Sequence, residues 1–409
     1  MTTQPVALPR SSATAARFAT AGRARFGFVL AIAAQILMMA GASAPSPFYP
    51  VLAQRIGFDA IVITAVFAVY ALSLMLTLLT AGSLSDHVGR RPVAVVGFVL
   101  LAASMLLFWN AGSVLILILA RIVQGVASGL LISALSAAVL DLEPPTRPGS
   151  AALWNALCPG IGLAGGALVA GITLDATPNA LTDVFAPLAA IYLVVAVLFL
   201  AAPETAQRLP GAWASLRFRL SVPSVIRADF WRAVPAIVAG WATGGLFLSL
   251  GANIVHSELG GTAHLWQGLA VALLAGVGAL TAFLIRRRSA RTILIFGTIA
   301  LAAGSALSLI ALGIASLPAY LVAAAVTGMG FGTAFFGVVG SLAPRIPATQ
   351  RADAFAVIFL LAYLAFGVPA VVAGLLVAPL GLEATCIGYG AVVIVLSVIA
   401  LVLRIRRPA

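Results

Sequence analysis

The chain has 409 residues, of which 62% are hydrophobic and 8% are charged, and its formal net charge is +12. A soluble domain is about a quarter charged, so this composition excludes an ordinary soluble protein. All 23 basic residues are arginine, and they lie mostly between long apolar segments. We therefore expect the positive charge to face a lipid bilayer, and we do not expect the protein to bind nucleic acid.

Apolar segments long enough to cross a bilayer recur along the whole chain. A hydrocarbon core of roughly 30 Å needs about 20 helical residues. We therefore predict an all-α polytopic membrane protein with twelve transmembrane helices, the first of which should bend or end at Pro45, Pro47 and Pro50. The predicted helices lie at 26–50, 60–83, 93–111, 113–140, 150–174, 184–202, 231–256, 264–285, 292–314, 317–342, 352–378 and 384–403.

The two halves of the chain repeat one another. At an offset of 203 residues, residues 120–129 overlay residues 323–332, and residues 169–171 overlay residues 372–374. Such a repeat predicts two pseudo-symmetric six-helix bundles. The resulting division is a basic tail at 1–25, a first bundle at 26–202, a linker at 203–230 and a second bundle at 231–404.

The arginines are distributed unequally between the two sides of the predicted membrane. If the amino terminus is cytoplasmic, 21 of the 23 arginines lie in the tail, in cytoplasmic segments or at the carboxyl terminus, and the exceptions are Arg55 and Arg121. Cytoplasmic loops of membrane proteins carry such an excess. We therefore predict that both termini are cytoplasmic. The alanine-rich, lysine-free composition suggests a high-GC bacterial genome, so the expected location is the bacterial inner membrane.

A polar segment, Gly82-Ser83-Leu84-Ser85-Asp86-His87-Val88-Gly89-Arg90-Arg91-Pro92, separates the second and third predicted helices. It resembles the loop between helices 2 and 3 of the major facilitator superfamily, G-x-L-x-D-x-x-G-R-R/K. The resemblance implies a conformational switch in which Asp86 and Arg90 meet an acid at the inner end of helix 4, here Asp141, and the start of helix 11. The alternative is an ordinary positive loop that anchors two helices. The implied switch residues are Gly82, Asp86, Gly89, Arg90, Arg91 and Asp141.

Arg121 lies in the middle of the fourth predicted helix, in a segment that resembles the helix 4 motif R-x-x-Q-G-x-G/A of the same family. An arginine at mid-membrane costs about 2.5–3.5 kcal/mol on insertion scales, so it needs a partner or a water-filled cavity. Asp141 is about 30 Å away along the helix and cannot pair with it, whereas Gln124 is one turn away. Arg121 therefore either lines a cavity and acts on substrate or proton transfer, or binds backbone carbonyls and holds helices together.

None of the eleven carboxylates falls at the middle of a predicted helix. Proton-coupled transporters often carry the proton on a central acid. Coupling here must therefore use groups near the membrane surfaces, such as Asp86, Asp141, Asp175 or Glu258; otherwise the protein is uncoupled or carries an anion opposite Arg121.

The family resemblance also implies a substrate cavity lined by helices 1, 4, 7 and 10 and their neighbours. Its candidate lining and coupling residues are Gln35, Arg121, Gln124, Trp154, Asn155, Trp241, Asn253 and Thr327. Aromatic and polar side chains together suit amphipathic ligands.

Sites for disulfides, metals, cofactors or catalysis are not expected. The two cysteines, Cys158 and Cys386, fit neither a disulfide framework nor a zinc motif. A chain without lysine has no phosphate-binding loop of the G-x-x-x-x-G-K-[ST] type. We therefore expect no enzymatic activity, no metal and no cofactor.

The predicted function is export of small amphipathic compounds by alternating access, in exchange for protons. The segment Gly162-Leu163-Ala164-Gly165-Gly166 is similar to the helix 5 motif G-P-x-x-G-G of drug/proton antiporters, but it lacks the central proline and is one residue shorter. The alternative is a proton symporter or an uncoupled facilitator for an organic anion or another small metabolite. In either case we expect a monomer.

Overall fold

The computed structural model describes residues 10–206 and 220–405, and within these residues the ordered elements are all helical. Eleven of the described helices are long and apolar enough to span a membrane. The number rises to twelve if the bent pair Ser224–Ser249 and Gly251–Glu258, with 59° between its parts, is one span. The prediction of an all-helical membrane protein with up to twelve spans is therefore confirmed.

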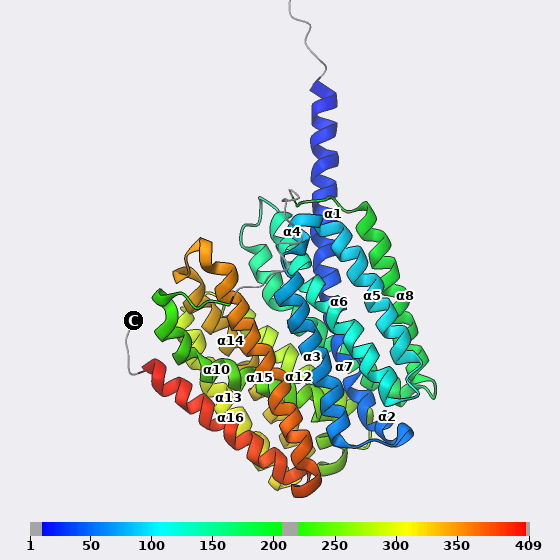
Figure 1. Ribbon diagram of the computed structural model, residues 1–409, viewed down its shortest axis with the longest axis vertical. Helices are drawn as coiled ribbons and strands as arrows, with labels where there is room; N and C mark the ends of the chain where they lie inside the picture. Colours follow the sequence, from blue (N-terminus) through cyan, green and yellow to red (C-terminus); the bar gives the residue numbers. More distant parts are fainter. Residues whose placement is uncertain (1–9, 207–219, 406–409) are drawn as a thin grey trace, which may run out of the picture.

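The helices form two successive groups (Figure 1). The first bundle contains α1 (Arg10–Ser43), η1 (Ser46–Phe48), α2 (Tyr49–Ile56), α3 (Ala60–Ala81), α4 (Leu84–Val88), α5 (Arg90–Trp109), α6 (Val114–Asp141), α7 (Ser150–Ala176) and α8 (Ala180–Ala201). The second bundle contains α10 (Ser224–Ser249), α11 (Gly251–Asn253), η2 (Ile254–Glu258), α12 (His264–Ile285), α13 (Ala290–Gly313), α14 (Leu317–Leu342), η3 (Ala343–Arg345), η4 (Ala348–Gln350), α15 (Arg351–Leu380) and α16 (Leu382–Ile405).

The first span breaks where its prolines predict a break. Helix α1 ends at Ser43, and Pro45 precedes the short helices η1 and α2. The seventh span also breaks, between α10 and α11, although the sequence predicts one continuous helix over 231–256. The prediction of one continuous helix is therefore wrong. The break falls at Leu250, where no proline marks it in the sequence, and it is followed by Gly251 and a π-helical turn.

Two predicted segment boundaries also differ from the structure. Helix α1 begins at Arg10, so part of the predicted tail over 1–25 is helical, and residues 1–9 lie outside the described residues. Helix α10 begins at Ser224, inside the predicted linker over 203–230. Residues 207–219 of that linker also lie outside the described residues.

The interior of the first bundle is filled by aromatic rings. Phe185 packs on Phe48 and Phe108, with ring centroids 5.0 and 5.3 Å apart. Nearer the other end of the bundle, Phe98 packs on Tyr192 and Phe199. Close packing of this kind holds the helices in fixed relative positions.

The two bundles meet along two helix pairs, α3 with α15 and α7 with α12. We call the end of the molecule that carries α4 and the start of α5 the Arg-rich end; it is at the top of Figure 1. Helices α3 and α15 are in closest contact at the opposite end. A Cβ atom added to Gly374 would lie 2.0 Å from Thr64 Oγ1, whereas one added to Gly367, nearer the Arg-rich end, would lie 3.5 Å from Ala71 Cβ.

Candidate functional site

The structure brings together three of the predicted switch residues at the Arg-rich end. Asp86 and Arg90 form an ion pair across the start of α5. Arg90 Nε lies 3.4 Å from Asp141 Oδ2 at the end of α6, and Arg90 Nη1 donates a hydrogen bond of 2.7 Å to Ser85 Oγ. The arginine therefore connects the loop to the end of the fourth span. Its part in a conformational switch stays a prediction.

Glu204 completes this cluster and was not among the predicted site residues. Its Oε1 accepts a hydrogen bond of 2.8 Å from the Arg90 amide, and its Oε2 accepts one of 3.2 Å from the Arg91 amide. These are the first two amides of α5, which lack partners within the helix. A carboxylate at a helix amino terminus also interacts favourably with the helix dipole. Glu204 therefore caps α5 from beyond the end of α8.

Gly89 makes room for this arrangement, and Gly82 closes the preceding helix. Gly89 has φ +120°, a backbone conformation that favours glycine, and a Cβ atom there would lie 2.5 Å from Glu204 Oε2. Gly82 ends α3, where its amide donates a 3.1 Å hydrogen bond to the Leu78 carbonyl.

Replacing Glu204 with alanine should uncap α5. Loss of an N-cap costs about 1 kcal/mol, which corresponds to a fall of about 2–4 °C in melting temperature for a unit the size of one bundle. The measurement is the melting temperature of the purified protein in detergent. Glu383→Ala, which removes an exposed carboxylate from the start of α16, is the matched control. Equal melting temperatures for the two variants would contradict the capping role.

Arg121 is fully buried in the first bundle. Its Nε donates a hydrogen bond of 2.9 Å to the Tyr49 hydroxyl, and its Nη1 donates to Gln124 Oε1 and, at 3.3 Å, to the Ala42 carbonyl. Gln124 Nε2 in turn donates a hydrogen bond of 2.7 Å to the Gly41 carbonyl. These carbonyls belong to the last turn of α1, and Tyr49 is the first residue of α2. The Arg121–Gln124 pair therefore holds the two sides of the break in the first span.

The guanidinium of Arg121 is also enclosed by aromatic rings. Its Cζ lies 5.2 Å from the ring centroid of Tyr70, 5.3 Å from Phe108 and 5.6 Å from Tyr49. Within residues 10–206 and 220–405, no carboxylate lies within ion-pair distance of it. A helix carboxyl terminus and aromatic faces both stabilise a cation. These contacts are the ones expected of an arginine that holds helices together, and a role toward substrate stays a prediction.

Three further candidates lie within the first bundle. Gln35 Nε2 donates a hydrogen bond of 2.8 Å to Asn155 Oδ1, and Asn155 Nδ2 donates one of 3.1 Å to the Ser136 carbonyl. Trp154 is partly buried against the cluster that contains Phe28. These side chains connect α1, α6 and α7.

Trp241 belongs to a group of rings at the boundary between the bundles. Its ring centroid lies 5.0 Å from Tyr363, 5.4 Å from Phe335 and 5.6 Å from Phe366. The ring of Phe366 packs on that of Phe67 in the first bundle, with the ring centroids 4.8 Å apart. The group also includes Phe359. We call these six residues, Phe67, Trp241, Phe335, Phe359, Tyr363 and Phe366, the interbundle aromatic cluster.

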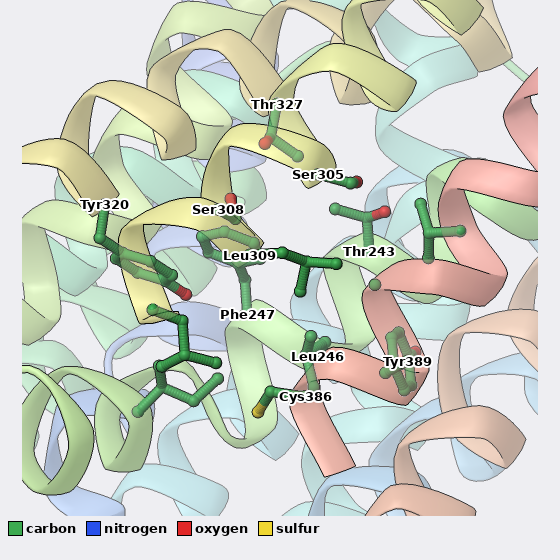
Figure 2. Close-up of a pocket in the computed structure, with 14 residues that line it drawn as sticks. Thr243, Leu246, Phe247, Ser305, Ser308, Leu309, Tyr320, Thr327, Cys386 and Tyr389 are labelled. Carbon is green, nitrogen blue, oxygen red and sulfur yellow. The ribbon is translucent and has the colours of Figure 1, made fainter. Parts of the chain in front are cut away.

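The remaining two candidates, Thr327 and Asn253, lie within the second bundle. Thr327 is fully buried and lines a cavity of about 40 Å³ between α10, α13, α14 and α16, which Figure 2 shows together with Thr243 and Ser305. Its hydroxyl donates to the Ala323 carbonyl. Asn253 lies at the break of the seventh span, and its buried Oδ1 has no hydrogen-bond partner within the described residues. The structure therefore does not bring Thr327 to the boundary between the bundles.

A polar contact joins the bundles at the end opposite the Arg-rich end. Asp175, in the last turn of α7, accepts hydrogen bonds of 2.9 and 2.8 Å from the amides of His264 and Leu265, which begin α12. The His264 imidazole Nδ1 also lies 2.8 Å from Asp175 Oδ1. Both side chains are about one-third exposed. We call this contact the Asp175–His264 latch; the sequence marked Asp175 only as a possible proton-coupling group.

Comparisons with known proteins agree with this architecture. The human organic anion transporter MFSD10 (TETRAN) superposes with a TM-score of 0.67 at 16% identity, over 92% of this chain and 99% of its own. A POT family transporter in complex with 5-aminolevulinic acid superposes with a TM-score of 0.72 at 15% identity, over 94% of this chain and 96% of its own. Because the sequence identities are only 16% and 15%, these two superpositions show a shared fold and nothing more.

A sequence relative and a family model add to this. The quinolone resistance protein NorA of Staphylococcus aureus is 25% identical over 108 residues, which are 26% of this chain and 28% of NorA. The match thus spans little more than a quarter of that relative. The family model described as Major Facilitator Superfamily matches residues 31–335, most of the chain. The protein therefore belongs to the major facilitator superfamily, and it is a secondary transporter and not an enzyme.

Proposed function

We propose that this transporter exports small amphipathic compounds by alternating access, in exchange for protons. The observation that supports this proposal is the interbundle aromatic cluster. Trp241, Phe335 and Phe359 in it are only partly buried, so part of their surface is available to a ligand. Aromatic surface binds apolar groups by burial and cationic groups through the ring faces. Such a surface suits compounds with an apolar body and either no charge or a positive one.

The surroundings of Arg121 favour this substrate class over an organic anion. The guanidinium is fully buried, and it already donates to Tyr49, Gln124 and the Ala42 carbonyl. An anion would have to displace these partners before it could pair with Arg121. The partial similarity to NorA, a protein named for quinolone resistance, also supports export of drug-like compounds.

The Asp175–His264 latch supports a link to protons. We take the end of the molecule that carries it to be the outer end, as the arginine distribution predicts. A carboxylate and an imidazole both bind protons, and here they are in direct contact across the boundary between α7 and α12. A change in the protonation of this pair would alter closure at this end.

The test uses the purified protein in liposomes with an imposed pH gradient and an internal proton-sensing dye. Lipophilic cations, neutral drugs and organic anions are added in turn. We expect proton movement with cations and neutral compounds. Trp241→Ala should raise the concentration for half-maximal response about tenfold, because an aromatic contact contributes up to about 1.5 kcal/mol and 1.4 kcal/mol is a factor of ten.

The matched control is Trp231→Ala, which removes a tryptophan that is 64% exposed on α10, and it should leave the response unchanged. A response to anions alone would contradict the proposed substrate class. Transport of labelled compound without proton movement would contradict the exchange and indicate an uncoupled facilitator.

A further inference from the structure

The second bundle has a charged pocket at its Arg-rich end that the proposed function does not use. The pocket has a volume of about 670 Å³ and lies between the start of α10, the start of α13 and the ends of α14 and α16. Its charged lining consists of Asp229, Arg232, Arg345 and Arg404. We call it the second-bundle basic pocket. Three arginines against one aspartate leave an excess of two positive charges.

The hydrogen bonds in this pocket leave part of the positive charge without a partner. Asp229 pairs with Arg232, with Nη1 to Oδ1 at 2.9 Å, and also with Arg345. The buried Nε of Arg404 has no hydrogen-bond partner within the part of the chain that the structure describes. A buried donor without a partner costs about 1–3 kcal/mol. Within the described residues, no carboxylate lies within ion-pair distance of Arg404 either.

The equivalent place in the first bundle is filled by a carboxylate of the chain itself. There, Glu204 accepts hydrogen bonds from the first two amides of α5, those of Arg90 and Arg91. Helix α13 corresponds to α5, and its first residue, Ala290, lines the second-bundle basic pocket. Ser289 Oγ caps α13 by accepting a hydrogen bond of 3.1 Å from the Thr292 amide, but no described residue accepts one from the amides of Ala290 and Arg291. The second bundle thus presents a helix amino terminus, arginines and an open volume where the first bundle holds an anion.

The surface around the pocket is apolar. Val225 and Leu403 line the pocket and are 58% and 38% exposed, and Trp231, next to Arg232, is 64% exposed. Exposed tryptophan is typical of the level where a membrane meets water. Basic pockets between helices on the cytoplasmic side bind the head groups of anionic lipids. The apolar rim favours a ligand that carries hydrocarbon chains.

We propose that the second-bundle basic pocket binds a phosphate group, supplied by the head group of an anionic phospholipid of the inner leaflet. The phosphate oxygens accept hydrogen bonds from Arg404 and Arg345 and lie at the start of α13, as the Glu204 carboxylate does at the start of α5. Helix amino termini and arginines are both common phosphate ligands. The bound group connects α10, α13, α14 and α16, so it stabilises the second bundle.

The test is a lipid titration of the purified, delipidated protein, followed by native mass spectrometry and by melting temperature. The probes are dioleoyl phosphatidylglycerol, dioleoylglycerol, which has the same chains without phosphate, and inorganic phosphate. We expect one saturable phosphatidylglycerol adduct that raises the melting temperature, and no such adduct with dioleoylglycerol. A stabilising adduct with inorganic phosphate alone would retain the phosphate site and assign it to a free anion.

Variants test whether the lipid adduct forms in the second-bundle basic pocket. Arg345→Gln should weaken phosphatidylglycerol binding at least tenfold; the Arg345 side chain is 55% exposed, so its loss is tolerated by the fold. Arg404→Gln should do the same. Arg288→Gln, in the exposed loop before α13, removes the same charge outside the pocket and should change binding less than twofold. Equal binding by wild type and both pocket variants, or an equal loss with Arg288→Gln, would overturn the proposal.

Discussion

Arg121→Leu is expected to reduce transport at least tenfold while the protein still folds. Two large contributions to the free energy of unfolding of this variant oppose each other. The Tyr49 hydroxyl and the Ala42 carbonyl lose a charged donor, at about 1–3 kcal/mol each, but the membrane cost of the guanidinium, about 2.5–3.5 kcal/mol, disappears. We expect a net loss of about 1 kcal/mol, or a fall of about 2–4 °C in melting temperature.

The transport loss has a separate cause. Arg121 and Gln124 hold the carbonyl end of α1 against the start of α2, and the guanidinium also lies against Tyr70, which packs in the core between the bundles. Without Arg121, the break in the first span is no longer fixed. Rearrangement of one bundle against the other requires rigid bundles. Transport should therefore fall by more than the loss of folded protein alone would cause.

Proteoliposome transport and melting temperature are measured together for this test. Arg55→Leu, at the exposed end of α2, is the control and should change the stability by less than about 0.5 kcal/mol. Arg121→Lys retains the charge but loses the planar fork, so its transport should lie between wild type and Arg121→Leu. Wild-type transport by Arg121→Leu would show that Arg121 is dispensable for the transport cycle.

Asp175→Asn is expected to open the end of the transporter that lies opposite the Arg-rich end. The Asp175 carboxylate accepts two amide hydrogen bonds from α12 and contacts the His264 imidazole. A charged cap at a helix amino terminus contributes up to about 2 kcal/mol. A change of 1–2 kcal/mol alters a ratio of states by a factor of about 5–30, so the ratio of molecules closed at this end to molecules open there should fall by about this factor.

Distances between spin labels at the outer ends of the two bundles measure this change. Suitable label positions are Asn179 in the first bundle and Thr262 in the second, both exposed, after replacement of the buried Cys158 and Cys386. The short-distance population should be smaller in Asp175→Asn than in the wild type. Asp183→Asn, which removes a carboxylate bonded only within the first bundle, should behave as the wild type. Equal short-distance populations in Asp175→Asn and the wild type would exclude the latch as a closing contact.

Much of the fold was readable from the sequence because it depends on local composition. Runs of about 20 apolar residues have few alternatives to spanning helices, and the prolines at 45, 47 and 50 indicated a break in the first span. The Asp86–Arg90 pair was also predictable, because its members are four residues apart in a segment with a recognisable motif.

Partners that come from different helices were decided only by the tertiary structure. The carboxylate of Glu204 reaches the start of α5 across 114 positions of the chain, and Arg121 reaches Tyr49 across 72. The same holds for the interbundle aromatic cluster and for the second-bundle basic pocket. The physical reason is that membrane helices are apolar on nearly every side, so hydrophobic periodicity does not distinguish the lipid-facing side from the side that packs on a neighbour. The rotation and approach of each helix, and therefore the contacts of its few polar groups, follow from packing in three dimensions.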